Sequence, residues 1–188
     1  RSVSLGGMVN PAFQFSPTQQ VELSTVYSRM TDDIARELTG FNLDSNTDQL
    51  NTRLQYVATS MWNAQLKGQH ELGFLGDVRL DWRGGWTRAS RYEPNTREVL
   101  YRETPGGTFV FDNFIQSGSI FHQDMVDDGL NGGLDLRLPA FEVADRDVEI
   151  AIGGAYTQRD RDVYSRRFRY IPAPGTQLTD DFRAQQPN

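Results

Sequence analysis

The 188-residue sequence contains no cysteine, a single lysine (Lys67) and only two histidines, His70 and His122. Without cysteine there can be no disulfide framework, no thiolate zinc site and no cysteine nucleophile. Acidic residues outnumber basic ones by 25 to 19, and the resulting net charge of −6 argues against a nucleic-acid-binding protein. No apolar run approaches the ~18–20 residues of a transmembrane helix. Membrane-spanning β-strands are not excluded, because each needs only ~9–11 residues of which alternate ones are apolar.

The chain begins at Arg1, with neither an initiator methionine nor a signal peptide. We therefore expect a processed product or a fragment of a longer protein.

Alternation of apolar and polar residues dominates the sequence and predicts β-strands. Between Val3 and Phe15 the odd positions are mostly apolar and the even positions mostly polar. The pattern recurs over 21–28, 53–72, 78–87 and 148–157, and we expect one long, bulged strand over 108–138. The best helical candidate, Thr31–Leu38, is weak. The sequence therefore predicts an all-β, antiparallel protein of about six strands in three hairpins.

The expected connections alternate between short and long. Short turns are predicted at Ser16–Thr18, Gly73–Gly76 and Pro139–Asp147, where Pro, Gly and Asp gather. Polar stretches at 32–51 and 89–107 are predicted to be long loops, and the tail from Tyr170 to Asn188 a further loop.

A sheet with one apolar face fits two environments. In a soluble sandwich or lipocalin-like barrel that face points inward, and in an outer-membrane barrel it points outward to lipid. Strand length favours the membrane, because the predicted strands at 3–15 and 53–72 far exceed the ~5–6 residues usual in soluble proteins. The charged opposite face suits a water-filled lumen, and the short and long connections suit periplasmic turns and external loops. Aromatic residues near strand ends are candidates for interface girdles: Phe13, Phe15, Phe74, Trp86, Tyr92, Phe141 and Tyr156.

Several short motifs follow one another in a particular order along the chain. They are Tyr27–Asp33, Thr52–Tyr56, Gln65–Gly73, Leu80–Trp82, Arg91–Asn95 with Tyr101, Asp127–Asp128, Leu134–Leu136, Val148–Tyr156, Arg159–Asp162 and Arg166–Tyr170. In this order and spacing they resemble the barrel of TonB-dependent receptors. The resemblance covers residues 3–171.

This resemblance implies a 22-stranded outer-membrane barrel with an N-terminal plug domain and a short box that contacts the inner-membrane protein TonB. The chain lacks the plug, the box and a closing strand, so residues 1–171 are expected to form part of such a barrel and 172–188 a loop or tail. The implied function is energy-coupled uptake of a scarce solute of the siderophore, glycan or peptide class. The implied partners are the TonB complex through the missing plug region, the solute, lipopolysaccharide and membrane lipids, and the implied location is the bacterial outer membrane.

The sequence predicts no catalytic residue, cofactor or metal site, and it identifies no individual substrate-binding residue. His70 is expected to be structural, and His122 with Asp124, Asp127 and Asp128 to form a polar loop or lumen face rather than a metal or acid/base site. The acids Asp32, Asp33 and Glu37 lack the ligand order of a calcium-binding loop.

The arginine-dense segment from Arg159 to Arg169 is interpreted as a salt-bridge ladder, with anion binding as the alternative. Ligand-facing stretches are expected in the long loops, at Glu37–Asn51, Ser90–Gly107 and Arg159–Gly175.

Two other classes stay open. One is a complete small outer-membrane barrel of eight strands, either structural or a membrane-embedded enzyme. The other is a soluble β-sandwich or lipocalin-like binding module. An enzyme is not expected.

Overall fold

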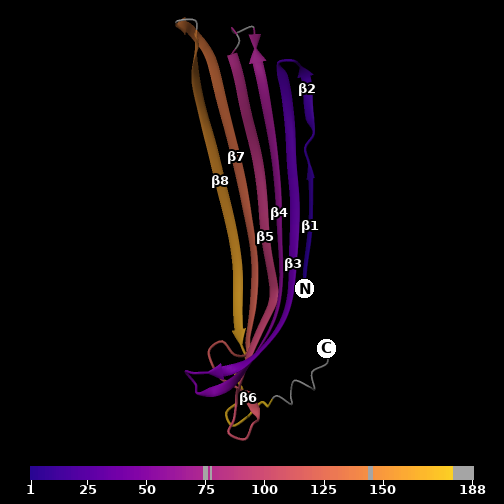
Figure 1. The fold of residues 1–188 in the computed structure, drawn as a ribbon, viewed down its shortest axis with the longest axis vertical. Helices are drawn as coiled ribbons and strands as arrows, with labels where there is room; N and C mark the ends of the chain where they lie inside the picture. Colours follow the sequence, from indigo (N-terminus) through magenta and orange to yellow (C-terminus); the bar gives the residue numbers. More distant parts are fainter. Residues whose placement is uncertain (74–75, 77, 144–145, 180–188) are drawn as a thin grey trace.

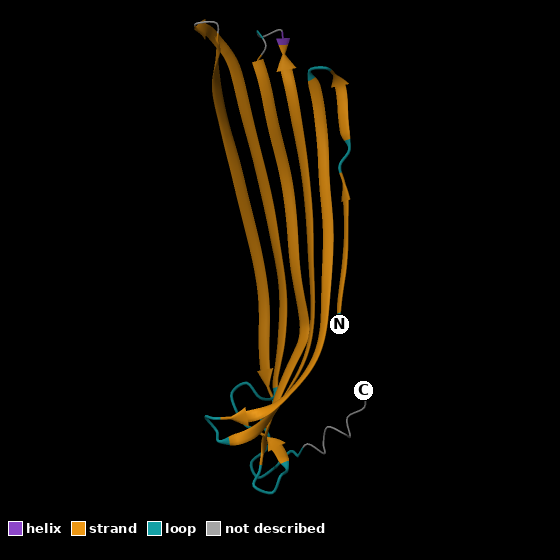
Figure 2. Ribbon diagram, viewed as in Figure 1, coloured by secondary structure: helices purple, strands orange, loops and turns teal. Residues whose placement is uncertain are grey.

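The computed structural model describes residues 1–73, 76, 78–143 and 146–179, with the side chains of 141–147 left out of the description. The chain forms one antiparallel sheet of very long strands, drawn in Figure 1 and Figure 2. The strands are β1 (Ser2–Val9), β2 (Ala12–Ser16), β3 (Gln19–Asn42), β4 (Thr47–Leu72), β5 (Val78–Glu103), β6 (Phe109–Phe111), β7 (Ser119–Val143) and β8 (Arg146–Arg169). The predicted all-β, antiparallel class is confirmed.

The order across the sheet is β1-β3-β4-β5-β7-β8, so chain neighbours lie side by side. The short strands β1 and β2 both pair with β3 and together make one edge strand, interrupted at Asn10 and Pro11. Proline has no N–H to donate, which an edge strand tolerates. The ladder continues through the carbonyl of Pro11, which accepts the N–H of Leu23 at 2.9 Å.

Most ladders run for the full length of the strands. Strand β3 pairs with β4 without interruption, from Gln19↔His70 to Asn42↔Thr47. The turn between them is closed by the side chain of Asn42, which accepts the backbone N–H groups of Asp44 at 2.8 Å and Ser45 at 3.3 Å. Asn46 then takes a positive φ of 51°, a conformation that asparagine tolerates better than most residues.

Several predicted loops are in fact strands. The helical candidate Thr31–Leu38 is wrong, because these residues continue β3. The loops predicted at Glu37–Asn51, Ser90–Gly107 and Arg159–Gly175 are wrong over most of their length, since β3, β4, β5 and β8 extend into them. In these extensions both faces are polar, so the backbone pairing is present although the alternation of hydrophobicity has vanished.

The segment 108–138 also differs from the prediction of one strand, because β6 and β7 are separated by residues 112–118. The turn at Ser16–Thr18 is confirmed between β2 and β3. Of the turn predicted at Gly73–Gly76, residues 74 and 75 lie outside the described residues. The turn predicted at Pro139–Asp147 is shorter than expected, because β7 continues to Val143 and β8 begins at Arg146, with 144–145 outside the described residues.

Two irregularities interrupt the central ladders. The β4–β5 register shifts between Leu54 and Ala58, and the β5–β7 register shifts between Glu93 and Thr96. Pro94 lies inside the second interval and cannot donate to the ladder, which accounts for a bulge there.

Buried apolar side chains are few among the described residues, and four of the seven lie at the end of the sheet away from the short turns. There Leu50, Leu100, Tyr101 and Val110 are all below a tenth exposed, where β6 and the connection after it fold back on β5. Ser117, fully buried, donates to the carbonyl of Leu100 and accepts its N–H. The rest of the described structure is a single layer without a second sheet or an α-helix packed on it.

Candidate functional surfaces: the two faces of the sheet

Strand alternation divides the side chains into two sets with opposite character. The apolar face comprises Leu66 and Trp82 with all residues in phase with them, such as Leu134. The polar face comprises Lys67 and Arg83 with the residues in phase with those two.

The apolar face carries a band of hydrophobic side chains, most of them exposed, next to the short turns. On β5 the band runs from Val78 to Trp86, nine residues, which matches the ~9–11 residues of a membrane-spanning strand. The other members of the band are Val9, Phe13, Val21, Leu23, Trp62, Ala64, Leu66, Leu72, Leu130, Leu134, Leu136, Leu138, Ile150 and Ile152. Exposure reaches 62% at Val9, 53% at Leu134 and 62% at Ile152. A surface this apolar and this continuous marks contact with lipid or with another protein.

A row of aromatic side chains ends the band on the side away from the short turns. Tyr27 on β3 pairs directly with Trp62 on β4, and the rings of Trp62 and Trp86 meet edge to face at 5.3 Å between centroids. The indole of Trp62 donates to the hydroxyl of Thr25 at 2.9 Å. Tyr156 on β8 completes the row, and its hydroxyl donates to Gln158 at 3.1 Å. Each ring has an apolar body and a polar group, as in the aromatic girdles of membrane proteins.

This boundary is slanted with respect to the rungs of the ladder. Tyr27 and Trp62 share a rung, Trp86 lies two residues nearer the short turns, and Tyr156 lies four residues nearer. Four residues of ~3.3 Å over four strand spacings of ~4.8 Å correspond to a slope of roughly 35°. Outer-membrane barrel strands tilt by ~35–45° relative to the barrel axis. The aromatic row would therefore be level in a membrane that the strands cross at that tilt.

Charged residues follow immediately beyond the aromatic row on the same face. Arg29 lies two residues beyond Tyr27, and Arg88 on β5 pairs with Asp128 on β7 at 3.8 Å. The neighbour of Asp128 on β8 is Asp160. Beyond this level the strands continue as an extension that is mostly polar on both faces, and β5 runs 17 residues past Trp86, roughly 55 Å of chain.

Of the seven aromatics predicted as girdle residues, Trp86 and Tyr156 lie on this row. Phe13 and Phe15 lie on β2 near the short-turn end of the sheet, and Tyr92 lies beyond the charged level. Phe74 and the side chain of Phe141 are outside the described part of the structure. Tyr27 and Trp62 were missed as girdle residues, and both lie in the interior of β3 and β4 in the structure.

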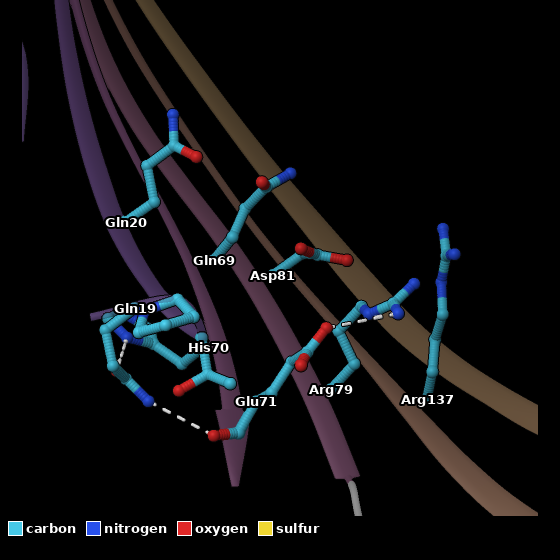
Figure 3. Close-up of a pocket in the computed structure, with 10 residues that line it drawn as sticks. Gln19, Gln20, Gln69, His70, Glu71, Arg79, Asp81 and Arg137 are labelled. Atoms are coloured by element: carbon cyan, nitrogen blue, oxygen red, sulfur yellow. Dashed lines mark hydrogen bonds and ion pairs between the residues drawn. The ribbon is translucent and has the colours of Figure 1, made fainter. Parts of the chain in front are cut away.

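The polar face near the short turns contains a hollow of about 240 Å³, shown in Figure 3. Its charged lining comprises Glu71, Arg79, Asp81 and Arg137, with Arg79 and Glu71 paired at 3.3 Å. His70 lies at its rim, where its Nε2 accepts the indole N–H of Trp82 at 3.0 Å. Its Nδ1 therefore carries the proton and donates to the side-chain oxygen of Gln19. With both ring nitrogens engaged, His70 cross-links three strands.

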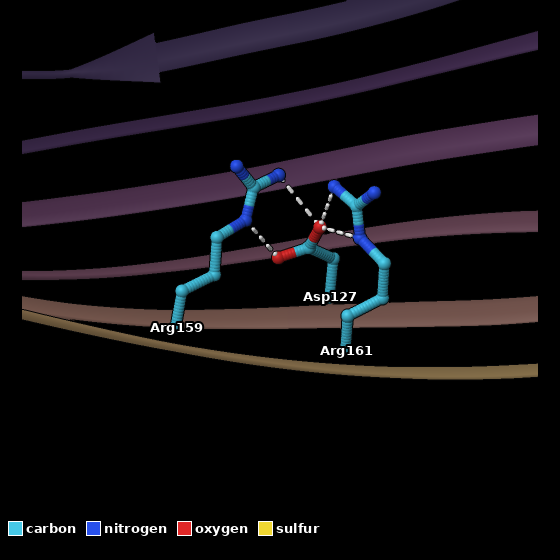
Figure 4. A network of polar contacts seen from close by, with 3 residues as sticks. All are labelled: Asp127, Arg159 and Arg161. Carbon is cyan, nitrogen blue, oxygen red and sulfur yellow. Dashed lines mark hydrogen bonds and ion pairs between the residues drawn. The ribbon is translucent and has the colours of Figure 1, made fainter.

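Asp127 lies on the polar face beyond the aromatic row, between two arginines of β8 (Figure 4). Arg159 donates from Nε at 2.7 Å and from Nη2 at 2.6 Å, and Arg161 donates from Nε at 2.6 Å. The side chain of Asp127 is 6% exposed, whereas those of Arg159 and Arg161 are 65% and 51% exposed. The hydrogen bonds from Arg159 outweigh the opposing effect of burial and, with Arg161, lower the pKa of Asp127 to about 2. The predicted salt-bridge ladder is present at these three residues.

Glu93, 3% exposed, lies at the bulge of β5, further beyond the aromatic row. It accepts hydrogen bonds from Thr96 at 2.5 Å, Gln55 at 2.9 Å and Arg91 at 2.8 Å. Burial raises the pKa of Glu93, but these three hydrogen bonds and the charge of Arg91 together leave it below its ordinary value. The sequence analysis missed this site, although the adjacent Pro94 was a signal that the ladder breaks there.

The other candidate residues separate rather than converge. His122 packs edge to face on Phe168 at 5.9 Å, on the same face as Asp124 and Asp128, whereas Asp127 faces the opposite side. The predicted grouping of His122 with the three acids is therefore split between the two faces. In the described part of the chain, no cluster of three or more histidines and acids has the geometry of a metal site.

Asp32 and Asp33 belong to β3 rather than to a loop. The Asp32 carboxylate accepts the hydroxyl of Ser2 at 2.5 Å, and the backbone carbonyl of Asp33 accepts the amino group of Arg1. The remaining arginines at the end of β8 pack locally. Arg166 lies over the ring of Tyr164 and Arg167 over that of Phe121, while Arg169 donates to the backbone carbonyls of Ser117 and Asn113.

Comparison with known proteins adds no family. No family model matches the chain, and no curated protein is significantly similar to it. Among the described residues, no helix is long and apolar enough to cross a membrane.

Proposed function

We propose that this chain is part of the wall of a TonB-dependent outer-membrane receptor, which captures a scarce solute and imports it with energy supplied through TonB. The apolar face contacts lipid, the polar face lines the water-filled interior, and the polar extension of the strands projects outside the cell. Binding and transport, rather than catalysis, are the work of these surfaces.

The slanted aromatic boundary is the observation that carries the membrane assignment. A soluble sheet buries its apolar face against a second layer, and no such layer exists among the described residues. A soluble interface has no reason to place rings on a line inclined by roughly 35° to the rungs, with charges directly beyond it. A bilayer does, because aromatic rings favour the interface and charges avoid the hydrocarbon.

The resemblance of residues 3–171 to TonB-dependent receptors supports the finer assignment. The strand lengths agree with it, since strands of 24 to 26 residues are more than twice what a bilayer requires. The excess forms an extracellular vestibule, in which a solute can be bound before it reaches the membrane level.

The membrane assignment is tested by fractionation of the full polypeptide that contains this chain, expressed in a Gram-negative host. We expect it to sediment with the outer membrane, to resist extraction by alkaline carbonate, and to migrate faster on gels before boiling than after. Recovery as a folded monomer in plain buffer would overturn the assignment and favour a soluble binding module.

The receptor assignment needs a separate test, because other proteins also have outer-membrane barrels. The detergent-solubilised full polypeptide is passed over the immobilised periplasmic domain of TonB. Retention supports the receptor. If a protein that passes the fractionation test is not retained, it is a membrane barrel of another kind.

A further inference from the structure

All four methionines of the chain lie on the polar face, at positions where the alternation predicts hydrophilic residues. They are Met8, Met30, Met61 and Met125, on β1, β3, β4 and β7. The last three line a broad hollow of about 720 Å³ together with Ala89. Methionine side chains are flexible and polarisable, and proteins use them on surfaces that adapt to apolar ligands. The hollow is therefore an apolar patch on a face that otherwise contacts water.

Arg29 and Arg91 line this hollow, and Arg159 and Arg161 lie just beyond its lining, on β8. Arg91 lies opposite Met125 on the β5–β7 ladder. Asp127 lies two residues from Met125 on the same strand and the same face, and it forms ion pairs with Arg159 and Arg161. Whereas Arg91 is matched by Glu93, two guanidinium groups share the single carboxylate of Asp127, which leaves one positive charge in excess.

The excess charge is available to a ligand. The contacts to Asp127 use Nε and Nη2 of each arginine, and the remaining Nη1 groups point away from the carboxylate (Figure 4). Both side chains are more than half exposed, whereas the carboxylate beneath them is covered. A ladder that served only to stabilise the sheet would match its charges, as Arg83 and Asp135 do at 3.0 Å on the same face.

We infer that this hollow binds a small anionic molecule with an apolar body. The apolar body lies against Met61 and Met125, and the anionic group lies on the outward N–H groups of Arg159 and Arg161. This deepens the proposed function, because it names the substrate class of the receptor interior, and it rests on the polar face being accessible to water. Arginine suits the task because its planar guanidinium can hold one carboxylate while it donates to a second anion.

The test uses two fluorescent probes that share a ring system and differ in charge, 1-pyrenesulfonate and 1-pyrenemethylammonium. Their binding to the full polypeptide in a nonionic detergent is measured by fluorescence anisotropy, against empty micelles. We expect the sulfonate to bind at least about tenfold more tightly than the ammonium, because a hydrogen bond to a charged group is worth ~1.5–3 kcal/mol. Inorganic sulfate should compete only weakly, because it lacks the apolar body.

Four variants separate the inference from a purely structural role. Arg161→Gln should lower sulfonate affinity about tenfold, and Arg161→Lys should restore most of it. Arg161→Gln leaves Asp127 with both hydrogen bonds from Arg159, so the sheet is preserved. Asp127→Asn should raise sulfonate affinity, since it removes the competing carboxylate. The matched control Arg83→Gln, on the same face but near the short turns, should leave it unchanged.

Equal affinity for the two probes, or an Arg161→Gln variant that binds like the parent, would overturn the inference. An absence of probe binding would also overturn the inference, including the case in which another segment of the polypeptide fills the hollow. Each preparation is first checked for outer-membrane localisation and heat-dependent gel mobility. Failure there refutes the proposed function, whereas failure of probe binding in a correctly inserted protein refutes only the ligand class.

Discussion

Replacing Leu66 by arginine places a charge in the middle of the apolar band. Leu66 is 40% exposed on the apolar face of β4, between the aromatic row at Trp62 and the end of the strand at Leu72. Its neighbour Gln65 lies at the same depth on the opposite face. Gln65→Arg is therefore a control that adds the same side chain at the same level without facing lipid.

The size of the effect depends on the solvent that Leu66 contacts. An arginine facing lipid at the bilayer midplane costs ~2–4 kcal/mol, equivalent to roughly a 30- to 900-fold change in the folding equilibrium. A half-exposed surface position in water tolerates the same substitution within ~0.5 kcal/mol. The two environments therefore predict free energies of unfolding that differ by more than the error of the measurement.

The assay is reversible urea unfolding of the full polypeptide in lipid vesicles, followed by tryptophan fluorescence and by gel mobility without boiling. We expect Leu66→Arg to lower the unfolding free energy by ~2–4 kcal/mol and Gln65→Arg to change it by less than ~1 kcal/mol. If both variants unfold at the same urea concentration, Leu66 does not face lipid, and the membrane assignment fails.

Three further predictions concern stability and local order. Glu93→Gln should destabilise the protein by ~1.5–3 kcal/mol at pH 7 in urea unfolding. The folded-state pKa of Glu93 lies below its ordinary value of 4.5. The contribution of the ionised Glu93 to stability is therefore complete above pH 4.5 and is lost as the pH falls through the folded-state pKa, so parent and variant should converge in acid. Gly68→Ala should lower the free energy of unfolding by ~1–3 kcal/mol and alter the near-ultraviolet circular dichroism spectrum, because a Cβ at this position would lie 2.3 Å from the indole ring of Trp82. Gly84→Ala is the control and should change neither quantity, because the space around Gly84 is open. Arg169→Ala should speed proteolysis within residues 112–118, whose carbonyls it binds, while Arg167→Ala should not; equal cleavage rates would show that Arg169 does not hold this segment.

The sequence predicts the part of the sheet that carries the apolar band well, because there one face is apolar and the other polar. Under that condition side chains alternate, as between Val78 and Trp86, and strand, face and short turn all follow from the pattern. Beyond the aromatic row the condition fails. Segments such as 37–42 and 90–103 are polar on both faces and have the composition of loops, although backbone pairing makes them strands.

The candidate sites were less predictable, because they depend on which strands become neighbours. Asp127 lies near Arg159 and Arg161 in the sheet, but a separation of more than 30 residues carries no local signal. The methionine hollow did have a signal, since Met30, Met61 and Met125 interrupt a polar phase on three strands. These residues become neighbours through the register of strand pairing, which is known only from the structure.

The membrane assignment has a consequence for the two edges of the sheet. On the outer edge of β8, about half of the backbone N–H and C=O groups point away from β7, and the apolar band includes Ile150 and Ile152 at that edge. Each unsatisfied group would cost several kcal/mol in hydrocarbon, so an open edge cannot persist at that depth. If the apolar face meets lipid, both β8 and the β1–β2 edge must pair with further strands. Because residues 1–188 contain no cysteine, a cysteine introduced at either edge has no partner within this chain, and disulfides with cysteines placed in candidate partner strands would reveal which strands those are.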